Sequence, residues 1–174
     1  MSYLLVEGNL QFDFSACKPI TPVQHFDSKQ NNPYGMKTVD FFTETEDCLY
    51  FVEVKDYQHP EAKQLRRQED YEMLTNAIMQ KTSVFTLEMG QKIKDSLLRK
   101  YALGEEITKQ VIYLLFVNLD GYGSRERLRL KEKIGGYIPM GLNDDKFAAF
   151  TSITFDLVNV EQLEKYGIAC KPKV

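Results

Sequence analysis

The sequence predicts a mixed α/β domain in which a central antiparallel β-hairpin is flanked by helices. Two segments rich in Val, Phe and Tyr, residues 37–44 and 49–57, are separated by a short polar connection, which is typical of a hairpin. Residues 110–118 form an apolar run without alternation, as expected of a central strand covered on both faces. Segments with helical spacing lie between and after these strands, so we expect at least one parallel pairing beside the hairpin.

The remaining elements follow from local patterns. Residues 1–14 predict two short strands about a turn at Gly8-Asn9. Helical spacing continues from Pro60 to about residue 81, and again up to Gly104. Ser124 is a candidate cap for a basic helix that ends at residues 135–136.

The last part of the chain predicts a strand over residues 149–158 and then a short helix. Asn159 is a candidate N-cap for this helix, with Gln162 three residues later and Gly167 as its stop.

Composition places the chain among globular proteins. It has 174 residues, 43% of them hydrophobic and 27% charged, which favours a single domain over residues 1–174. No apolar run is long enough to span a bilayer and the N-terminus has no basic leader, so we expect a cytoplasmic protein without a membrane partner. Three widely spaced cysteines argue against a disulfide framework and a thiolate zinc site.

The net charge of −3 hides an uneven distribution. Residues 55–133 carry 15 basic and 12 acidic groups, whereas residues 1–54 carry 3 basic and 8 acidic groups. The middle of the chain therefore has candidate basic surfaces, for which solvated helix faces are the commoner explanation than a phosphate-binding track.

The register of the hairpin decides whether two acidic residues can meet. A turn centred on Glu46 and Asp47 places Asp40 directly opposite Glu53 and on the same face. Cβ atoms of such a pair lie about 4.5–5.5 Å apart, close enough for two carboxylates to share a cation. Lys55 projects from the same face, whereas a slip of one residue would move Asp40 to the other face.

Both faces of this hairpin are apolar. Leu49, Phe51 and Phe42 are expected on the face of Glu53, and the other face is expected to carry Val39, Phe41, Val52 and Val54. Charged groups in such a strand pair cost several kcal/mol per ion unless pairing or a metal compensates. A solvated ion cluster is the alternative, but the apolar surroundings favour a functional site.

The segment from Val39 to Lys55 resembles a known motif. Val39-Asp40, a short hairpin and then Phe51-Val52-Glu53-Val54-Lys55 resemble the core of the PD-(D/E)XK, or restriction-endonuclease-like, nuclease superfamily, with Val39 in place of proline. The helix after the motif and the later buried strand agree with this resemblance. It covers a core of about residues 1–120 and leaves residues 121–174 as an addition.

The resemblance implies a site for Mg²⁺ or Mn²⁺. Asp40, Glu53 and the backbone carbonyl of Val54 would hold the metal, with Asp27 as the candidate upstream acid ahead of Glu7 and Asp13. Lys55 would orient or activate the attacking water. Some exonucleases of the superfamily carry a Gln-x3-Tyr helix motif, which Gln68 and Tyr71 miss by one residue. The substrate-binding candidates on the first helix are Gln64, Arg67 and Gln68.

The function implied is metal-dependent hydrolysis of nucleic acid, with DNA favoured over RNA and with a homodimer or a partner protein as further possibilities. The first alternative is a nuclease-fold module that binds or assembles without catalysis, and the second is a fortuitous match, since short motifs recur. His25 and His59 are the only histidines, and neither belongs to a metalloprotease motif or a catalytic triad.

Overall fold

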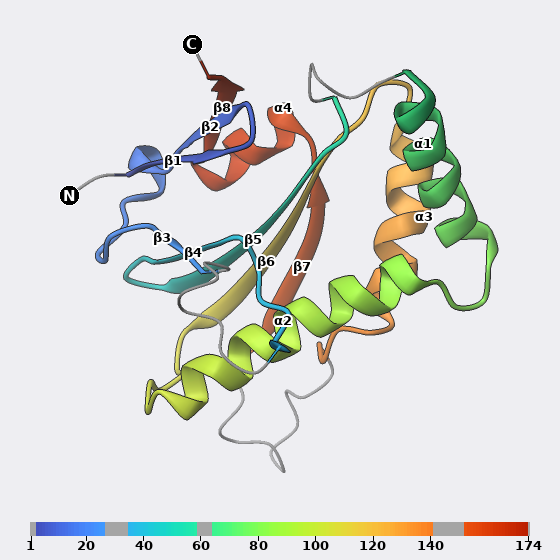
Figure 1. The fold of residues 1–174 in the computed structure, drawn as a ribbon. Coiled ribbons are helices and arrows are strands. Elements are labelled where there is room, and N and C mark those ends of the chain that lie inside the picture. Colours follow the sequence, from blue (N-terminus) through green and yellow to red (C-terminus); the bar gives the residue numbers. More distant parts are fainter. Residues whose placement is uncertain (1–2, 27–34, 59–63, 141–151, 174) are drawn as a thin grey trace.

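The computed structural model describes residues 3–26, 35–58, 64–140 and 152–173, which form two β-sheets and four α-helices (Figure 1). The mixed α/β class expected from the sequence is therefore confirmed.

The larger sheet has the strand order β3-β4-β5-β6-β7. Strands β3, β4 and β5 pair antiparallel, whereas β5, β6 and β7 pair parallel. Parallel neighbours require a crossover connection, and helices supply it on both occasions. The strands are β3 (Gln24–His25), β4 (Phe41–Glu44), β5 (Cys48–Asp56), β6 (Gln110–Asn118) and β7 (Ile153–Val158).

Three helices cover one face of this sheet: α1 (Gln64–Met79), α2 (Val84–Ala102) and α3 (Ser124–Gly135). Leu74 of α1, Ile93 of α2 and Leu130 of α3 are fully buried in one core with Phe51 and Tyr113 of the strands. Figure 1 shows α2 crossing beneath the sheet, with α1 and α3 side by side. Helix α2 is therefore the element that closes the sheet face on which Glu53 lies.

A small sheet covers the opposite face, in the order β1-β2-β8. Phe12 of this sheet packs edge-on against Phe41 and Phe116, with ring centroids 5.3 and 5.5 Å apart. The predicted N-terminal hairpin is confirmed, but the pairing of β2 with β8 was not expected from the sequence. The elements on this side are β1 (Leu4–Glu7), β2 (Leu10–Asp13), β8 (Ala169–Pro172) and α4 (Val160–Leu163).

Two of the predicted helix caps have different outcomes. The Asn159 side chain accepts from the backbone N–H of Gln162 at 2.9 Å, and the Gln162 side chain accepts from the backbone N–H of Asn159 at 3.1 Å. This capping box is therefore confirmed. The expectation for Ser124 was wrong, because Gly123 is the N-cap of α3 and no side chain caps it. A local pattern of polar residues does not distinguish two neighbouring cap positions.

The first strand of the hairpin is shorter than predicted, because β4 begins at Phe41 and not at residue 37. The backbone N–H groups of Lys37 and Val39 donate to Asp95 and Ser96 of α2 at 2.8 and 3.0 Å. This segment is therefore held by α2 on one side and by Phe26, the residue after β3, on the other: the Asp40 carbonyl accepts from the Phe26 N–H, and the Thr38 hydroxyl donates to the Phe26 carbonyl. The predicted strand at residues 149–158 begins at Ile153, and residues 149–151 lie outside the described part of the chain.

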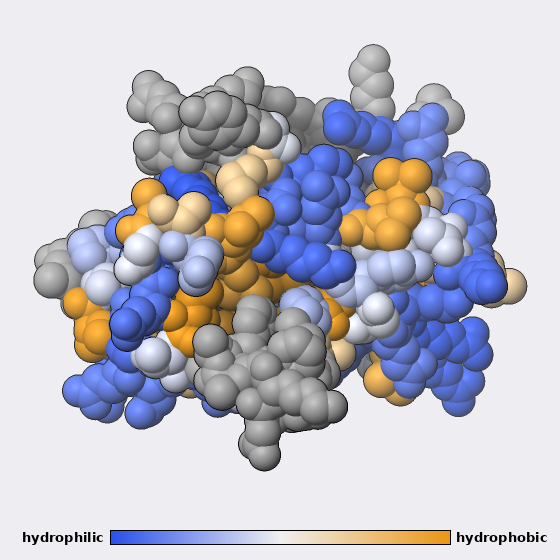
Figure 2. Space-filling view, turned by 90° about the horizontal axis from the view of Figure 1, so that it is seen from below, coloured by the Kyte–Doolittle hydropathy of each residue, from blue (hydrophilic) through white to orange (hydrophobic). Residues whose placement is uncertain are grey.

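Figure 2 views the molecule from below, the side on which α2 lies in Figure 1. Hydrophilic side chains separate the apolar areas on this face. Within the four described ranges, no helix combines the length and the apolar character that crossing a membrane requires.

Candidate metal and active site

The hairpin has the register that the turn at Glu46 and Asp47 predicts. Phe41 pairs with Val52 and Phe42 pairs with Phe51, and the same register continued by one residue sets Asp40 opposite Glu53. Asp40 itself precedes the first ladder pair, and its Oδ2 accepts a hydrogen bond from the backbone N–H of Val54 at 2.6 Å. The predicted hairpin register is confirmed, and Asp40 lies next to Val54, the residue after Glu53.

Glu53 is fully buried and is contacted by two ammonium groups. Lys55 Nζ lies 2.6 Å from Oε1, and Lys92 Nζ lies 2.8 Å from Oε2. Lys92 also donates to the backbone carbonyl of Thr38 at 3.0 Å. The sequence pointed to Lys55 but not to Lys92, which reaches the site from α2.

The predicted apolar surroundings of Glu53 are confirmed with one correction. Phe42, Leu49 and Phe51 belong to the core on its face of the sheet. Val39 packs in this same core, whereas the sequence placed it on the opposite face. The strand alternation that predicts faces does not apply to Val39, because it lies before the first residue of β4.

Burial, and after it the nearby charge of Asp40, raise the pKa of the Glu53 carboxyl to about 7, against the opposing effect of Lys55 and Lys92. Each oxygen of this buried carboxylate is thus paired with one ammonium group. A buried carboxylate with this environment is typical of functional sites.

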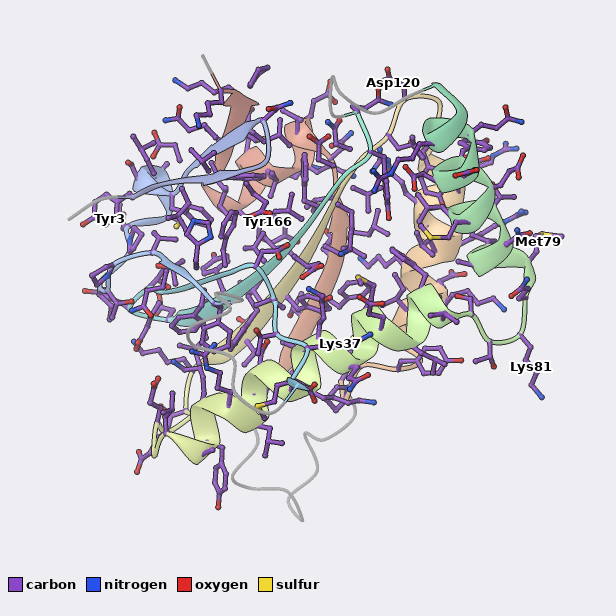
Figure 3. The ribbon with its side chains drawn as sticks, in the orientation of Figure 1. Tyr3, Lys37, Met79, Lys81, Asp120 and Tyr166 are labelled. Atoms are coloured by element: carbon purple, nitrogen blue, oxygen red, sulfur yellow. The ribbon has the colours of Figure 1, made fainter. Side chains whose placement is uncertain are left out.

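Helix α2 fixes the backbone next to Asp40 through a buried polar stripe. Ser96 Oγ accepts from the Val39 N–H at 3.0 Å and donates to the Lys92 carbonyl at 2.7 Å. Lys37 lies beside α2 (Figure 3), and its ammonium is 3.3 Å from Glu88 of that helix. Ser96 and Lys92 together thus connect α2 to both acidic partners, a role that the amphipathic pattern of the helix gave no reason to expect.

The structure describes only part of the remaining predicted site residues, which are Asp27, Gln64, Arg67 and Gln68. Asp27 lies outside the described residues, and so do the side chains of Gln64 and Arg67, whose backbone belongs to α1. Gln68 is exposed and donates to Glu72 at 3.2 Å along the helix surface. Within the described ranges, no group of three or more His, Cys, Asp or Glu side chains could hold a metal ion. Of the predicted metal ligands, the structure therefore describes Asp40, Glu53 and Val54.

Several cations of the candidate basic surfaces serve internal contacts. Lys100 is buried over the Phe42 ring and pairs with Glu105. Arg127 donates to the carbonyls of Tyr122 and Val117 at 3.1 and 3.0 Å. These cations are therefore committed to the fold, which reduces the charge available for a phosphate-binding track on this part of the surface.

The described site is thus a buried glutamate of a mixed sheet, between two lysines and next to an aspartate. No family model, curated protein or solved structure matches the chain.

Proposed function

We propose that this protein is a metal-dependent nuclease with a restriction-endonuclease-like fold, which hydrolyses phosphodiester bonds in nucleic acid. The observation that carries the proposal is the convergence of Asp40 and Lys55 on the buried Glu53. The Asp40 carboxylate accepts from the N–H of the next residue, Val54, and Lys55 Nζ lies 2.6 Å from Glu53 Oε1. The hairpin register predicted this contact from the turn at Glu46 and Asp47.

The order of elements gives independent support. The resemblance implies a hairpin with the two acids, a helix directly afterwards and then a buried strand. Here β4 and β5 are followed by α1 and α2, and β6 then pairs parallel with β5 along its whole length. This order agrees with the proposed superfamily.

The chemistry of the donors fits a hard divalent cation. Carboxylate and carbonyl oxygens are the ligands that Mg²⁺ and Mn²⁺ prefer. Each oxygen of the buried Glu53 lies beside an ammonium group, at 2.6 and 2.8 Å, so a cation held by this carboxylate would share it with Lys55 and Lys92. In the proposal Asp40, Glu53 and the Val54 carbonyl hold the cation, and Asp27 is the candidate for a further ligand.

The proposed division of labour follows from these positions. A bound cation supplies Lewis acidity, which polarises the phosphodiester and lowers the pKa of water. Lys55 is the more exposed of the two lysines, with 24% of its side chain accessible, so it is the one that orients water and offsets negative charge developing on the phosphate. Gln64, Arg67 and Gln68 on α1 are the candidate phosphate contacts.

A catalytically inactive binding or assembly module is the second candidate. It is favoured by the internal use of Lys100 and Arg127 and by the two ammonium groups already beside Glu53. The two candidates differ in whether DNA is cut and not in the fold.

The test is cleavage of supercoiled plasmid, single-stranded DNA and RNA with Mg²⁺ or Mn²⁺, with EDTA as the negative control. Single changes of Asp40, Glu53 and Lys55 to Ala are expected to reduce cleavage by about 100-fold or more, while circular dichroism shows a folded protein. Cleavage that survives Asp40→Ala contradicts the mechanism. Nucleic-acid binding without any cleavage supports the inactive module.

A further inference from the structure

Helix α2 contributes a second lysine to the candidate site. Lys92 is 7% exposed, and its ammonium lies between Glu53 Oε2 at 2.8 Å and the Thr38 carbonyl at 3.0 Å. Its neighbours on α2, Met89 and Ile93, are buried in the hydrophobic core. The Lys92 charge is therefore held in place by packing on one side and by oxygen atoms on the other.

The two lysines contact different oxygens of Glu53 and differ in their freedom to move. Lys55 has 24% of its side chain exposed and can turn toward solvent, whereas 8% of the Lys92 side chain is exposed. A fixed positive charge beside a carboxylate repels any further cation that the carboxylate accepts, and this repulsion is strong where water is excluded. Because Lys92 is held in place, its charge repels a metal ion bound by Glu53 in every arrangement of the site.

We propose that Lys92 is a positioning residue that sets the affinity of the site for its divalent cation, by holding Glu53 Oε2 and by opposing the added positive charge. The cation then binds weakly to the protein alone. This inference rests on the proposed function, because it takes Asp40 and Glu53 as the metal ligands.

The test is calorimetric titration of the protein with MgCl2 at pH 8.5 and at pH 9. Two pH values are used because Lys92 lowers the pKa of Glu53, so its removal raises that pKa above about 7. Lys92→Met and Lys92→Gln are both expected to lower the Mg²⁺ dissociation constant by about tenfold or more, because each removes the opposing charge. Lys92→Arg keeps the charge and is expected to leave the dissociation constant near that of the unchanged protein. Thermal unfolding of each variant verifies that it folds.

Lys100→Met is the matched control, because Lys100 is an equally buried lysine of the same helix, 4% exposed, that pairs with Glu105 and not with Glu53. It is expected to reduce stability without changing Mg²⁺ affinity. The proposal is overturned if Lys92→Met and Lys92→Gln bind Mg²⁺ as the unchanged protein does, or more weakly, or if no variant binds Mg²⁺ at all.

The proposed function fails separately. If Lys92→Met tightens Mg²⁺ binding but the unchanged protein cuts no nucleic acid, the assignment of Lys92 stands and the nuclease proposal falls. If the protein cuts DNA but Lys92→Met does not tighten Mg²⁺ binding, the nuclease proposal stands and the assignment of Lys92 falls.

Discussion

Oδ2 of Asp40 accepts a hydrogen bond from the backbone N–H of Val54 at 2.6 Å. Val54 lies between Glu53 and Lys55, so this single bond ties the residue before β4 to the middle of the motif on β5. Hydrogen bonds to charged acceptors are shorter and stronger than neutral ones. The bond therefore fixes the position of the Asp40 carboxylate relative to the Glu53 segment in the protein without a ligand.

Asp40→Asn separates the charge of this residue from its place in the hairpin. The amide oxygen of Asn can still accept from the Val54 N–H, so the free energy of unfolding is expected to fall by no more than about 2 kcal/mol. Loss of the negative charge is expected to reduce Mg²⁺-dependent cleavage by about 100-fold or more. Urea denaturation and a plasmid-nicking assay measure the two effects.

Glu44→Gln is the control for Asp40→Asn, because Glu44 lies four residues further along the chain, at the turn end of the hairpin, and forms an ion pair with Lys109 at 2.6 Å. It is expected to change neither cleavage nor metal binding. If both variants lose cleavage equally, the loss is caused by a disturbed hairpin and not by the missing charge of Asp40.

Glu53→Gln is expected to change how stability depends on pH. The pKa of Glu53 is raised from 4.5 to about 7 in the folded protein. Between these two pH values Glu53 is therefore protonated in the folded protein and ionised in the unfolded chain. This contribution to stability is fully present below pH 4.5 and is lost as the pH rises through 7. Relative to Glu53→Gln, the unchanged protein is expected to lose about 3 kcal/mol between pH 4.5 and pH 8.

The measurement is the difference in free energy of unfolding between Glu53→Gln and the unchanged protein, taken from urea titrations at several pH values in EDTA. Only the change of this difference with pH is informative, since the variant also leaves Lys55 and Lys92 without their acidic partner at every pH. A difference that stays constant from pH 4.5 to pH 8 contradicts a raised pKa for Glu53.

Ser96→Ala tests whether α2 positions Asp40. The substitution leaves the buried Val39 N–H without its acceptor, which is expected to cost about 1–3 kcal/mol of stability. Because Val39 is adjacent to Asp40, the Mg²⁺ dissociation constant is expected to rise about tenfold, as for other changes behind a metal ligand. Chemical denaturation and calorimetric titration measure the two quantities.

The control is Ser83→Ala, which removes the N-cap of the same helix. It is expected to cost about 1 kcal/mol of stability and to leave Mg²⁺ affinity unchanged. If both serine variants weaken Mg²⁺ binding alike, the effect belongs to the helix as a whole and Ser96 has no special role.

Lys55→Met tests the catalytic assignment apart from metal binding. It is expected to reduce the rate of single-turnover cleavage by about 100-fold without weakening Mg²⁺ binding, since a cation is removed from beside the metal ligands. Lys109→Met is the matched control, because the two side chains are 24% and 25% exposed and each pairs with a glutamate at 2.6 Å. A Lys55 variant that cuts normally would exclude this lysine from the chemistry.

The sequence by itself determined the hairpin and its register. The composition of the two strands predicted the hairpin, and the polar turn at Glu46 and Asp47 predicted which residues face each other. The two-residue period of a strand then put Glu53 and Lys55 on one face. These are local properties, because each depends on neighbours within one turn and its two strands. The capping box at Asn159 and Gln162 was predictable for the same reason.

Only the tertiary structure decided what meets the hairpin. Lys92 and Ser96 come from a helix that lies far along the chain, and nothing in their spacing distinguishes a lysine turned toward a buried glutamate from one turned toward water. The course of the chain through Val39 and the pairing of β2 with β8 likewise depend on distant partners. Local patterns fix faces and turns, whereas the contacts that surround Glu53 arise only when separate elements pack together.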